Sequence, residues 1–461
     1  MRKALLLLLL CLTAAGCALQ PRYQRPAVEL PAAWRKTAPE AVLDGRWWRL
    51  YADPALDRLV EEAQAHNTDL AAAVARVDEA RGLLGETGSQ RYPSIDATAA
   101  RGRSLSSAAT GTLPPGLPRE LSDTRASLDV SYEVDLWGRL KAATRAARAD
   151  LLATEAARDT VRITLAADVV KGYFALRSLD EQVAAVRRTL ELREEALALQ
   201  KKRYQGGVIS DFDYRQLEAE AATTRALLPP LERDREIQQA ALAALLGRSP
   251  KEIMDGTLAR ADGAQSALVP AAVPSGLPSQ LLLRRPDLVA AEQRLVAAHA
   301  RVAVARADYF PRITLTGFLG TEAAAVRDLF TGPAGIAGLA AAAAQPVFEG
   351  GRLDAGLEVA RARERETLAA YRGAIQNAFR EVRAALAAQD RARESVLAEQ
   401  ARAQALVSAL RLARLRYGNG VGSQLDVIDA ERNLLAAQVA RYEALRAQRA
   451  AVADLFRALG G

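Results

Sequence analysis

Two long stretches of the chain carry apolar residues at spacings of three, four and seven positions. The first stretch has them at Leu179, Val183, Val186, Leu190, Leu197 and Tyr204, and the second at Ala403, Leu406, Leu410, Ala413 and Tyr417. This heptad spacing is typical of helices that pack lengthwise against other helices. Residues 136–204 and 351–417 contain no proline and are rich in Ala, Leu, Arg and Glu, which favour helix. The pattern predicts two continuous helices of ~100 Å each, longer than a compact domain can contain.

Each predicted long helix ends at a glycine-containing turn, and the helical pattern resumes a few residues later. The turns are residues 204–207 and 417–420, and a serine follows each of them at Ser210 and Ser423. Glycine can supply the left-handed conformation that closes one helix, and serine can cap the next. The sequence therefore predicts two helical hairpins, although an ordinary elongated coiled coil would show the same periodicity.

The chain repeats itself at an offset of 213 positions. The matching residues are Arg203, Tyr204, Gly207, Val208, Ser210, Asp213 and Glu218 in the first copy, and Arg416, Tyr417, Gly420, Val421, Ser423, Asp426 and Glu431 in the second. Residues 138–140 return in the same way as residues 351–353. Such self-similarity predicts that the second half is a structural copy of the first.

A short segment, residues 126–136, alternates strictly between apolar and polar side chains. Its apolar residues are Leu128, Val130, Tyr132 and Val134. Alternation with a period of two predicts a β-strand with one apolar face, which suits either a surface strand or a tilted bilayer crossing with these four side chains facing lipid. Residues 312–320 alternate more weakly, and residues 95–104 and 339–348 are expected partner strands without a clear pattern.

These segments give only four strands per chain. A membrane barrel needs about eight strands at least, because an open sheet edge in lipid leaves backbone groups without hydrogen bonds. If the strands cross a bilayer, several copies must therefore share one barrel, with eight strands from two copies or twelve from three.

The N-terminus has the features of a bacterial secretory signal. Arg2 and Lys3 precede the apolar residues 4–12, and small residues lead to Cys17. The Ala-Ala-Gly-Cys segment resembles the lipobox of lipoproteins, with Ala14 at the position where Leu is usual. We expect acylation at Cys17 after removal of residues 1–16, with ordinary cleavage and a free thiol as the alternative. No later stretch is long and apolar enough for a transmembrane helix.

The composition argues against several classes of protein. The 62 basic and 55 acidic residues are interspersed, which indicates solvated helix faces and no nucleic-acid partner. The mature chain has two histidines, His66 and His299, and we expect both to be structural or surface residues. It has no glycine-rich phosphate loop and no cluster with metal-ligand spacing. We therefore expect no catalysis, no cofactor and no metal site.

The lipobox, the duplicated pair of strands with its long hairpin, and the two glycine turns together resemble the outer-membrane efflux protein family of the TolC and OprM type, in its lipoprotein branch. The resemblance implies an α+β membrane protein with a two-fold internal repeat. Four transmembrane strands per chain would contribute to a homotrimeric 12-stranded barrel, continued by long coiled-coil helices as a periplasmic α-barrel. The expected segments are 1–16 (signal), 17–91 (N-terminal segment and first equatorial helix), 92–135 (first strand pair), 136–247 (first hairpin), 248–285 (equatorial linker), 286–309 (helix), 310–348 (second strand pair) and 349–461 (second hairpin).

The function implied by this resemblance is a passive exit duct anchored by lipid in the bacterial outer membrane and extending into the periplasm. An inner-membrane pump, expected to be of the RND type, would deliver drugs or metal ions through a periplasmic adaptor protein. A type I protein-secretion duct and a lipid-anchored scaffold without a pore are the alternatives. The tips expected to meet the adaptor comprise Gly206, Gly207, Val208, Ser210, Gly420, Val421 and Ser423.

The second turn is also similar to the family's gate region. Tyr417, Asp426 and Asp429 match it, and three copies of each aspartate on a narrow axis would repel one another and attract cations. The basic residue that TolC has near this turn falls on Gly422, which is a departure from the pattern. The two aspartates are equally consistent with ordinary first-turn residues at a helix N-terminus.

Overall fold

The computed structural model describes residues 23–31, 45–107, 118–256 and 281–461, with Ala109, Gly116 and Leu258. The expected signal segment and Cys17 lie outside these residues. The chain divides into two compact units. We call the first the sheet unit; it comprises Arg76–Glu155 and Ala290–Arg372, with the N-terminal residues as far as Ala27. We call the second the helical unit; it comprises Val28–Ala75, Ala156–Val289 and Gly373–Gly461.

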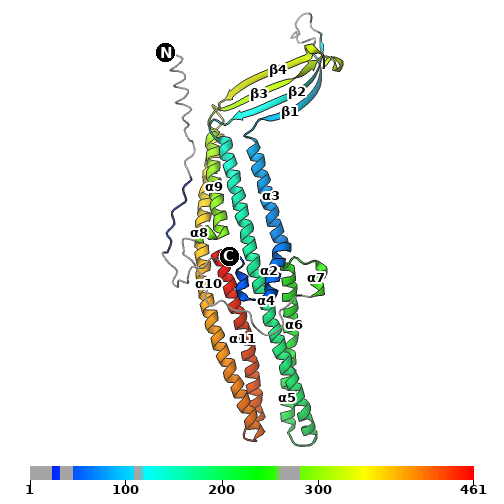
Figure 1. The fold of residues 1–461 in the computed structure, drawn as a ribbon, viewed down its shortest axis with the longest axis vertical. Coiled ribbons are helices and arrows are strands. Elements are labelled where there is room, and N and C mark those ends of the chain that lie inside the picture. The colour runs from blue at the N-terminus through cyan, green and yellow to red at the C-terminus, as the bar shows by residue number, and fades with distance from the viewer. Residues whose placement is uncertain are drawn as a thin grey trace. The chain divides into compact units, whose positions relative to one another are not determined.

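The sheet unit contains four antiparallel strands in the order β1-β2-β3-β4 (Figure 1). Their bounds are β1 (Ser94–Leu105), β2 (Glu120–Val134), β3 (Arg312–Ala323) and β4 (Gly335–Ala344). The expectation for the fourth strand, residues 339–348, was wrong at both ends. The strand is rich in alanine and shows no alternation that could fix its register, and Pro346, which has no N–H to donate, lies beyond its end.

Two glycines allow close approaches inside this sheet. A Cβ atom on Gly320 of β3 would lie 2.2 Å from the carbonyl oxygen of Ala126 on β2. A Cβ atom on Gly338 of β4 would lie 2.5 Å from the ring of Phe318 on β3. Only glycine fits at either position, and at Gly338 its bare backbone makes room for the aromatic ring.

The long helices are α4 (Arg139–Gln205) and α10 (Arg352–Gly418), with 67 residues each. Helix α4 returns through α5 (Asp211–Ala226) and α6 (Leu228–Leu245), whereas α10 returns through the single helix α11 (Gln424–Leu459). The other helices are η1 (Trp47–Tyr51), α2 (Pro54–His66), α3 (Thr68–Ser89), α7 (Pro250–Asp255), α8 (Leu281–Arg284), α9 (Pro286–Ala307), η3 (Val326–Asp328) and η4 (Gly332–Ala334). The predicted α+β fold with two long helical hairpins is confirmed.

An aromatic core joins the short and long helices of the helical unit. The Trp47 ring stacks on Phe456 at 4.9 Å between centroids, and the buried Tyr51 lies against Phe174. The Tyr51 hydroxyl donates a hydrogen bond to the Arg449 carbonyl oxygen at 2.7 Å. Buried hydroxyls are stable only with such partners, so this bond fixes η1 against α11.

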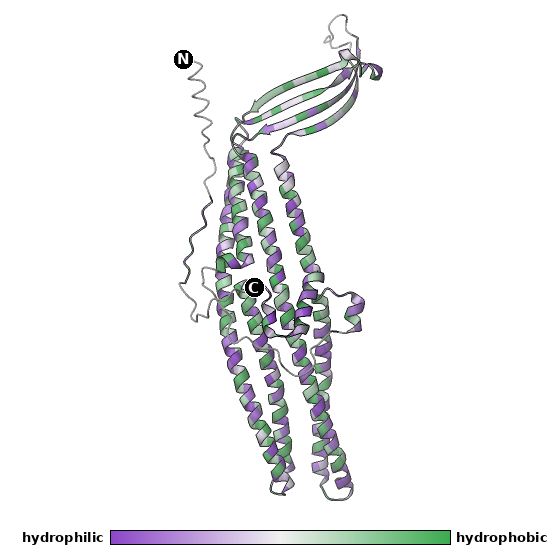
Figure 2. Ribbon diagram, in the orientation of Figure 1, coloured by the Kyte–Doolittle hydropathy of each residue, from purple (hydrophilic) through white to green (hydrophobic). Residues whose placement is uncertain are grey.

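Apolar and polar residues mix along most helices (Figure 2). In the described part of the chain, no helix combines the length and the apolar character needed to cross a membrane. Few charged side chains are buried, and in the described part of the chain six are: Asp53, Arg193, Glu220, Arg285, Glu292 and Arg449. His299 makes a structural contact from its Nδ1 atom to Glu364 at 2.6 Å, and His66 is exposed.

Candidate functional site

Apolar side chains from all four strands share one face of the sheet, while Phe318 of β3 and Ile336 of β4 lie on the other. The backbone register pairs Val130 with Ile95 and Leu128 with Leu319, so the alternation found in one strand continues across its neighbours. Leu128 is 51% exposed and Leu339 of β4 is 88% exposed. Of the four residues expected to face lipid, Leu128 and Val130 are exposed, and Tyr132 and Val134 are partly buried. An apolar face of this kind is unusual in water and suits contact with hydrocarbon.

The opposite face of the sheet carries a group of polar side chains that hydrogen-bond to one another. The Thr98 hydroxyl donates to Asp129 at 2.6 Å, and the Ser127 hydroxyl donates to the same carboxylate at 2.9 Å. Arg125 lies over the Phe318 ring, 4.6 Å from its centroid. Polar groups that satisfy one another in this way are typical of the water-facing side of a membrane strand.

The two outer strands of the sheet leave their outer edges unpaired. Within the described residues, β1 pairs only with β2, and β4 pairs only with β3. Each edge therefore presents a row of backbone N–H and C=O groups that another strand could satisfy.

The two hairpin turns have the same backbone design. Gly207 and Gly420 adopt left-handed conformations with φ of 69° and 73°. The N–H of the next residue, Val208 or Val421, donates to a carbonyl five residues earlier, at 2.9 Å and 3.0 Å. This is the Schellman arrangement, and glycine is favoured in it because a side chain would strain the left-handed residue. Val208 and Val421 are both largely exposed, so each turn presents an apolar residue at its end.

The serine after each turn begins the returning helix, as predicted. The Ser210 hydroxyl accepts a hydrogen bond from the Asp213 N–H, and the Ser423 hydroxyl accepts one from the Asp426 N–H, both at 3.1 Å. In return, the Asp213 carboxylate accepts a hydrogen bond from the Ser210 hydroxyl at 2.7 Å, whereas the Asp426 carboxylate accepts one from the Ser423 backbone N–H at 3.0 Å. The second turn thus has a complete capping box.

The three residues expected at the gate lie near the second turn. Hydrogen bonds from the Ser423 backbone and hydroxyl, followed by the nearby Arg416 charge, hold the pKa of Asp426 below its usual value. Asp429 lies 3.7 Å from the guanidinium of Arg432, and Tyr417 is partly buried. Within this one chain, the described side chains of these three residues make no hydrogen bond to one another.

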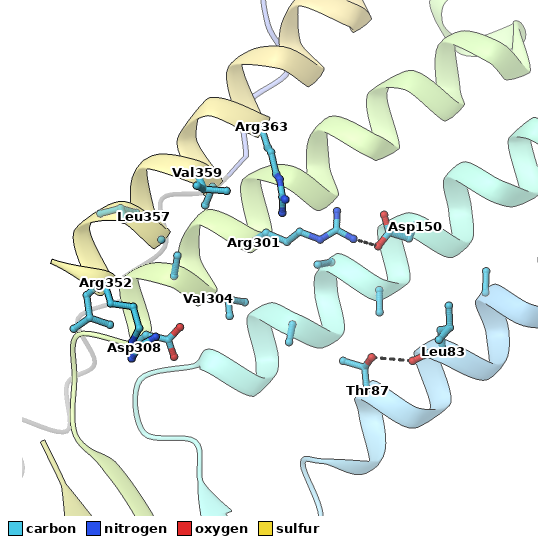
Figure 3. Close-up of a pocket in the computed structure, with 18 residues that line it drawn as sticks. Leu83, Thr87, Asp150, Arg301, Val304, Asp308, Arg352, Leu357, Val359 and Arg363 are labelled. Atoms are coloured by element: carbon cyan, nitrogen blue, oxygen red, sulfur yellow. Dashed lines mark hydrogen bonds and ion pairs between the residues drawn. The ribbon is translucent and has the colours of Figure 1, made fainter. Parts of the chain in front are cut away.

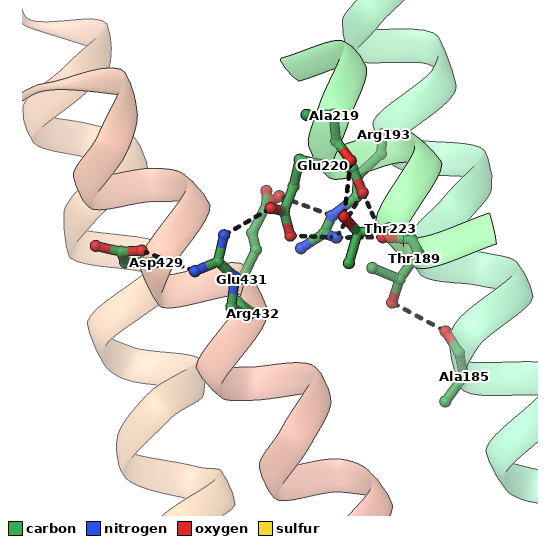
Figure 4. A network of polar contacts seen from close by, with 10 residues as sticks. Ala185, Thr189, Arg193, Ala219, Glu220, Thr223, Asp429, Glu431 and Arg432 are labelled. Carbon is green, nitrogen blue, oxygen red and sulfur yellow. Dashed lines mark hydrogen bonds and ion pairs between the residues drawn. The ribbon is translucent and has the colours of Figure 1, made fainter. Parts of the chain in front are cut away.

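A buried ionic network joins the two hairpins within the helical unit (Figure 4). Glu220 of α5 is 2.7 Å from Arg193 of α4 and also 2.7 Å from Arg432 of α11. The Arg193 guanidinium also donates to the Thr224 hydroxyl. Glu431 pairs with Arg414 at 2.7 Å and lies 3.8 Å from Arg193. Arg432 and Glu431 thus both connect the second hairpin to the first, Arg432 at the shorter distance.

Burial and ion pairing compete at the central carboxylate of this network. Burial of Glu220 raises its pKa, but the hydrogen bond from Arg432 and the charge of Arg193 outweigh burial and bring the pKa below its usual value. The sequence analysis missed this network because it treated the charges as solvated helix faces. The internal repeat could have revealed it, because the second copy has uncharged residues, Leu406 and Asn433, at the positions equivalent to Arg193 and Glu220. An apolar residue at one of these positions indicates that the site is buried.

The pattern that describes outer membrane efflux proteins matches residues 59–248 and 277–461. The chain belongs to the outer membrane efflux protein family. It is 35% identical to the outer membrane protein OprJ of Pseudomonas aeruginosa over 465 residues, which cover 98% of this chain and 95% of OprJ. It is 32% identical to the Probable outer membrane lipoprotein SilC of Salmonella typhimurium, over 97% of this chain and 96% of SilC.

A solved structure shows the same fold. The structure of CusC, whose title refers to transmembrane channel formation, matches with a TM-score of 0.85 and 31% identity, over 96% of this chain and 99% of that chain. The cation efflux system protein CusC of Escherichia coli is 32% identical over 461 residues, which cover 98% of this chain and 97% of CusC. The chain is therefore an outer-membrane efflux protein of a family of channels.

Proposed function

We propose that three copies of this chain form one continuous channel, the outer-membrane exit of a tripartite efflux system. The observation that carries the proposal is the four-stranded sheet with one apolar face and two unpaired edges. In hydrocarbon each unpaired backbone group costs several kcal/mol, so the free edge of β1 needs the free edge of β4 from another copy. Eight or twelve strands would both close a barrel, and the family supports twelve.

The apolar ends of the hairpins support docking of a periplasmic adaptor at the two turns. Val208 and Val421 are about two-thirds exposed, at 65% and 67%, and the Schellman bonds hold their backbones rigid. A pump of the RND type would then supply cargo from the inner membrane. We propose small molecules or metal ions as that cargo, in keeping with a relative that is named a cation efflux protein. Protein secretion remains the second candidate for the cargo, and crosslinking followed by identification of the co-purified pump separates the two.

A charge placed on either face of β2 tests the barrel. Leu128→Arg should reduce the yield of trimers in the outer membrane strongly, because arginine facing the bilayer midplane costs about 2–4 kcal/mol per copy. Ser131→Arg is the matched control on the polar face of the same strand, where the side chain meets water. Heat-resistant trimers on gels and single-channel currents report the outcome. Equal yields and currents from both variants would exclude a lipid-facing role for Leu128.

Removal of the acylation site tests the scaffold alternative. We propose that Cys17 carries the lipid anchor, and the name of SilC as an outer membrane lipoprotein supports this. A trimeric channel with the Cys17→Ala change should still need detergent for extraction, because its barrel remains in the bilayer. A scaffold held only by lipid would be released into buffer by the same change.

We also propose that Tyr417, Asp426 and Asp429 line a cation-sensitive constriction in the trimer. The lowered pKa of Asp426 supports this role, because its carboxylate stays ionised in mildly acidic solution. Asp426→Ala and Asp429→Ala should raise single-channel conductance and weaken block by divalent cations. Asp213→Ala, at the equivalent position of the first turn, is the matched control and should change neither property. Unchanged currents in both gate variants would remove these residues from the gate.

A further inference from the structure

A pocket of about 550 Å³ opens among α3, α4, α9 and α10 within the sheet unit (Figure 3). Its walls are mostly apolar, formed by small alanines and by Leu83, Val304, Leu357 and Val359. Pockets of roughly 300–1,000 Å³ with apolar walls and a few polar groups are typical of small-molecule sites. Its size is therefore suited to one small organic molecule.

Both carboxylates that line this pocket have ionic partners, whereas one of its arginines has none. Asp150 is paired with Arg301, and Asp308 is 3.0 Å from Arg312, so both lining carboxylates are already neutralised. Arg363 of α10 points toward Arg301 in Figure 3 and makes no ion pair with any described residue. The pocket thus has an exposed positive charge without an ionic partner beside an apolar surface, which is complementary to an anionic group on an apolar molecule.

The pocket lies on the face of α9 that is turned away from the N-terminal segment. The Arg25 guanidinium pairs with Glu292 at 2.6 Å, and the Tyr23 ring meets His299 edge-on. Arg301 follows His299 by two residues, which is a rotation of about 200° around the helix. The N-terminal segment and the pocket therefore occupy opposite faces of α9.

This opposition indicates which side of the channel wall the pocket faces. If the proposed function holds, the N-terminal segment leads to a lipid anchor and must run on the outer surface of the wall. The opposite face of α9 then borders the lumen. We propose that this pocket is a binding site on the export path for amphipathic anions, with Arg363 holding the anionic group and the alanine-lined wall holding the apolar body.

Two fluorescent probes with the same ring system isolate the role of charge. Anilinonaphthalene sulfonate is an amphipathic anion, and phenylnaphthylamine has the same rings without the sulfonate. Both would be titrated against the full-length protein in nanodiscs of neutral lipid, with empty nanodiscs subtracted. Arg363→Gln should weaken sulfonate binding roughly tenfold, because it removes a charge-assisted contact, and should change phenylnaphthylamine binding less than twofold.

Two further variants keep the test sharp. Arg365→Gln changes an exposed arginine of the same helix that does not line the pocket, and it should leave both titrations unchanged. Gly356→Leu adds a side chain where a Cβ atom meets nothing within 4 Å, and it favours helix, so it should fill the pocket without unfolding α10. Saturable binding of both probes should then be lost.

The possible failures are distinguishable. Equal weakening by Arg363→Gln and Arg365→Gln, or saturable binding that survives Gly356→Leu, overturns the site. A wild-type protein that conducts ions but shows no saturable binding overturns the inference and leaves the proposed channel standing. Binding that depends on Arg363 in a protein that never conducts keeps the anion site and removes the channel.

Discussion

The two helical hairpins share their turn design but differ in what lies between their arms. In the first hairpin, Arg193 and Glu220 form a buried ion pair beside Thr224. The equivalent positions of the second hairpin hold Leu406, Asn433 and Ala437. The returning arm is interrupted at Leu227 in the first hairpin, whereas in the second it is one helix of 36 residues.

This difference distinguishes structure that depends on nearby residues from structure that depends on contacts between the hairpins. The turns depend on residues within one short segment, and both copies keep them. The arms also meet a neighbouring hairpin, through an apolar cluster around Val186 and Leu435 and through the Glu220–Arg432 pair. Only one hairpin needs the central carboxylate, so the two copies could diverge there without loss of either turn.

The largest effect is expected from making the first hairpin resemble the second at one position. Arg193→Leu leaves Glu220 buried with only Arg432 as its ionic partner, and removal of one member of a buried pair costs about 3–5 kcal/mol. Thermal unfolding followed by circular dichroism measures the loss. Arg187→Leu is the control, because Arg187 pairs with Glu232 at an exposed site where such pairs contribute less than about 1 kcal/mol.

The double change tests whether the charge itself or its burial matters. Arg193→Leu combined with Glu220→Asn copies both residues of the second hairpin and removes both buried charges. Most of the stability lost in Arg193→Leu should return, because no uncompensated charge remains inside. A double variant as unstable as Arg193→Leu alone would show that the second hairpin's residues do not fit the first.

Acid should weaken the link between hairpins by the same mechanism. The folded-state pKa of Glu220 is below its unfolded value, so the ionised carboxylate stabilises the fold above the unfolded pKa. That contribution is lost as the pH falls below about 4 and passes through the folded pKa. The melting temperatures of the wild type and Glu220→Gln should therefore converge on acidification, and a constant difference down to pH 3 would contradict this assignment.

These differences show what the sequence could predict. The long helices and the strand with Leu128 followed from the spacing of apolar residues, because periodicity reports which face of an element is buried. Both turns followed from their glycines and from the serines that come after them. The pair formed by Glu220 and Arg432 did not, since those residues are 212 positions apart and meet only through helix packing. The bounds of β4 could not be predicted from the sequence either, because its alanines fit either face of a sheet.

The serine caps should differ in a smaller way. Loss of a serine cap costs about 1 kcal/mol. Ser423→Ala should be less destabilising than Ser210→Ala, because alanine keeps the backbone N–H that donates to Asp426, whereas Ser210→Ala also removes the hydroxyl that donates to Asp213. Hydrogen exchange at the first turns of α11 and α5 measures the two losses side by side. Equal acceleration in both variants would mean that the bond from the Ser210 hydroxyl to Asp213 adds nothing at the first turn.

The smallest effect is expected at the interruption of the first returning arm. Pro229 and Pro230 have no N–H groups to continue the hydrogen-bond ladder from α5, and the helix breaks at Leu227. Replacement of both prolines by alanine should let the arm become continuous, as in α11. The expected result is slower amide exchange around Leu227 with a gain in stability below about 1 kcal/mol. Unchanged exchange there would show that packing, and not proline, causes the interruption.

The contacts of Tyr23 and Arg25 with α9 limit the distance that the proposed lipid anchor can span. Tyr23 lies six positions after Cys17, and a fully extended chain over six positions spans about 20 Å. An acyl group on Cys17 would thus limit how far α9 can lie from the bilayer surface. A pump that pulled on the hairpins would have to extend the chain between Cys17 and Tyr23 fully, or break the Arg25–Glu292 pair, before it could move the channel away from the membrane.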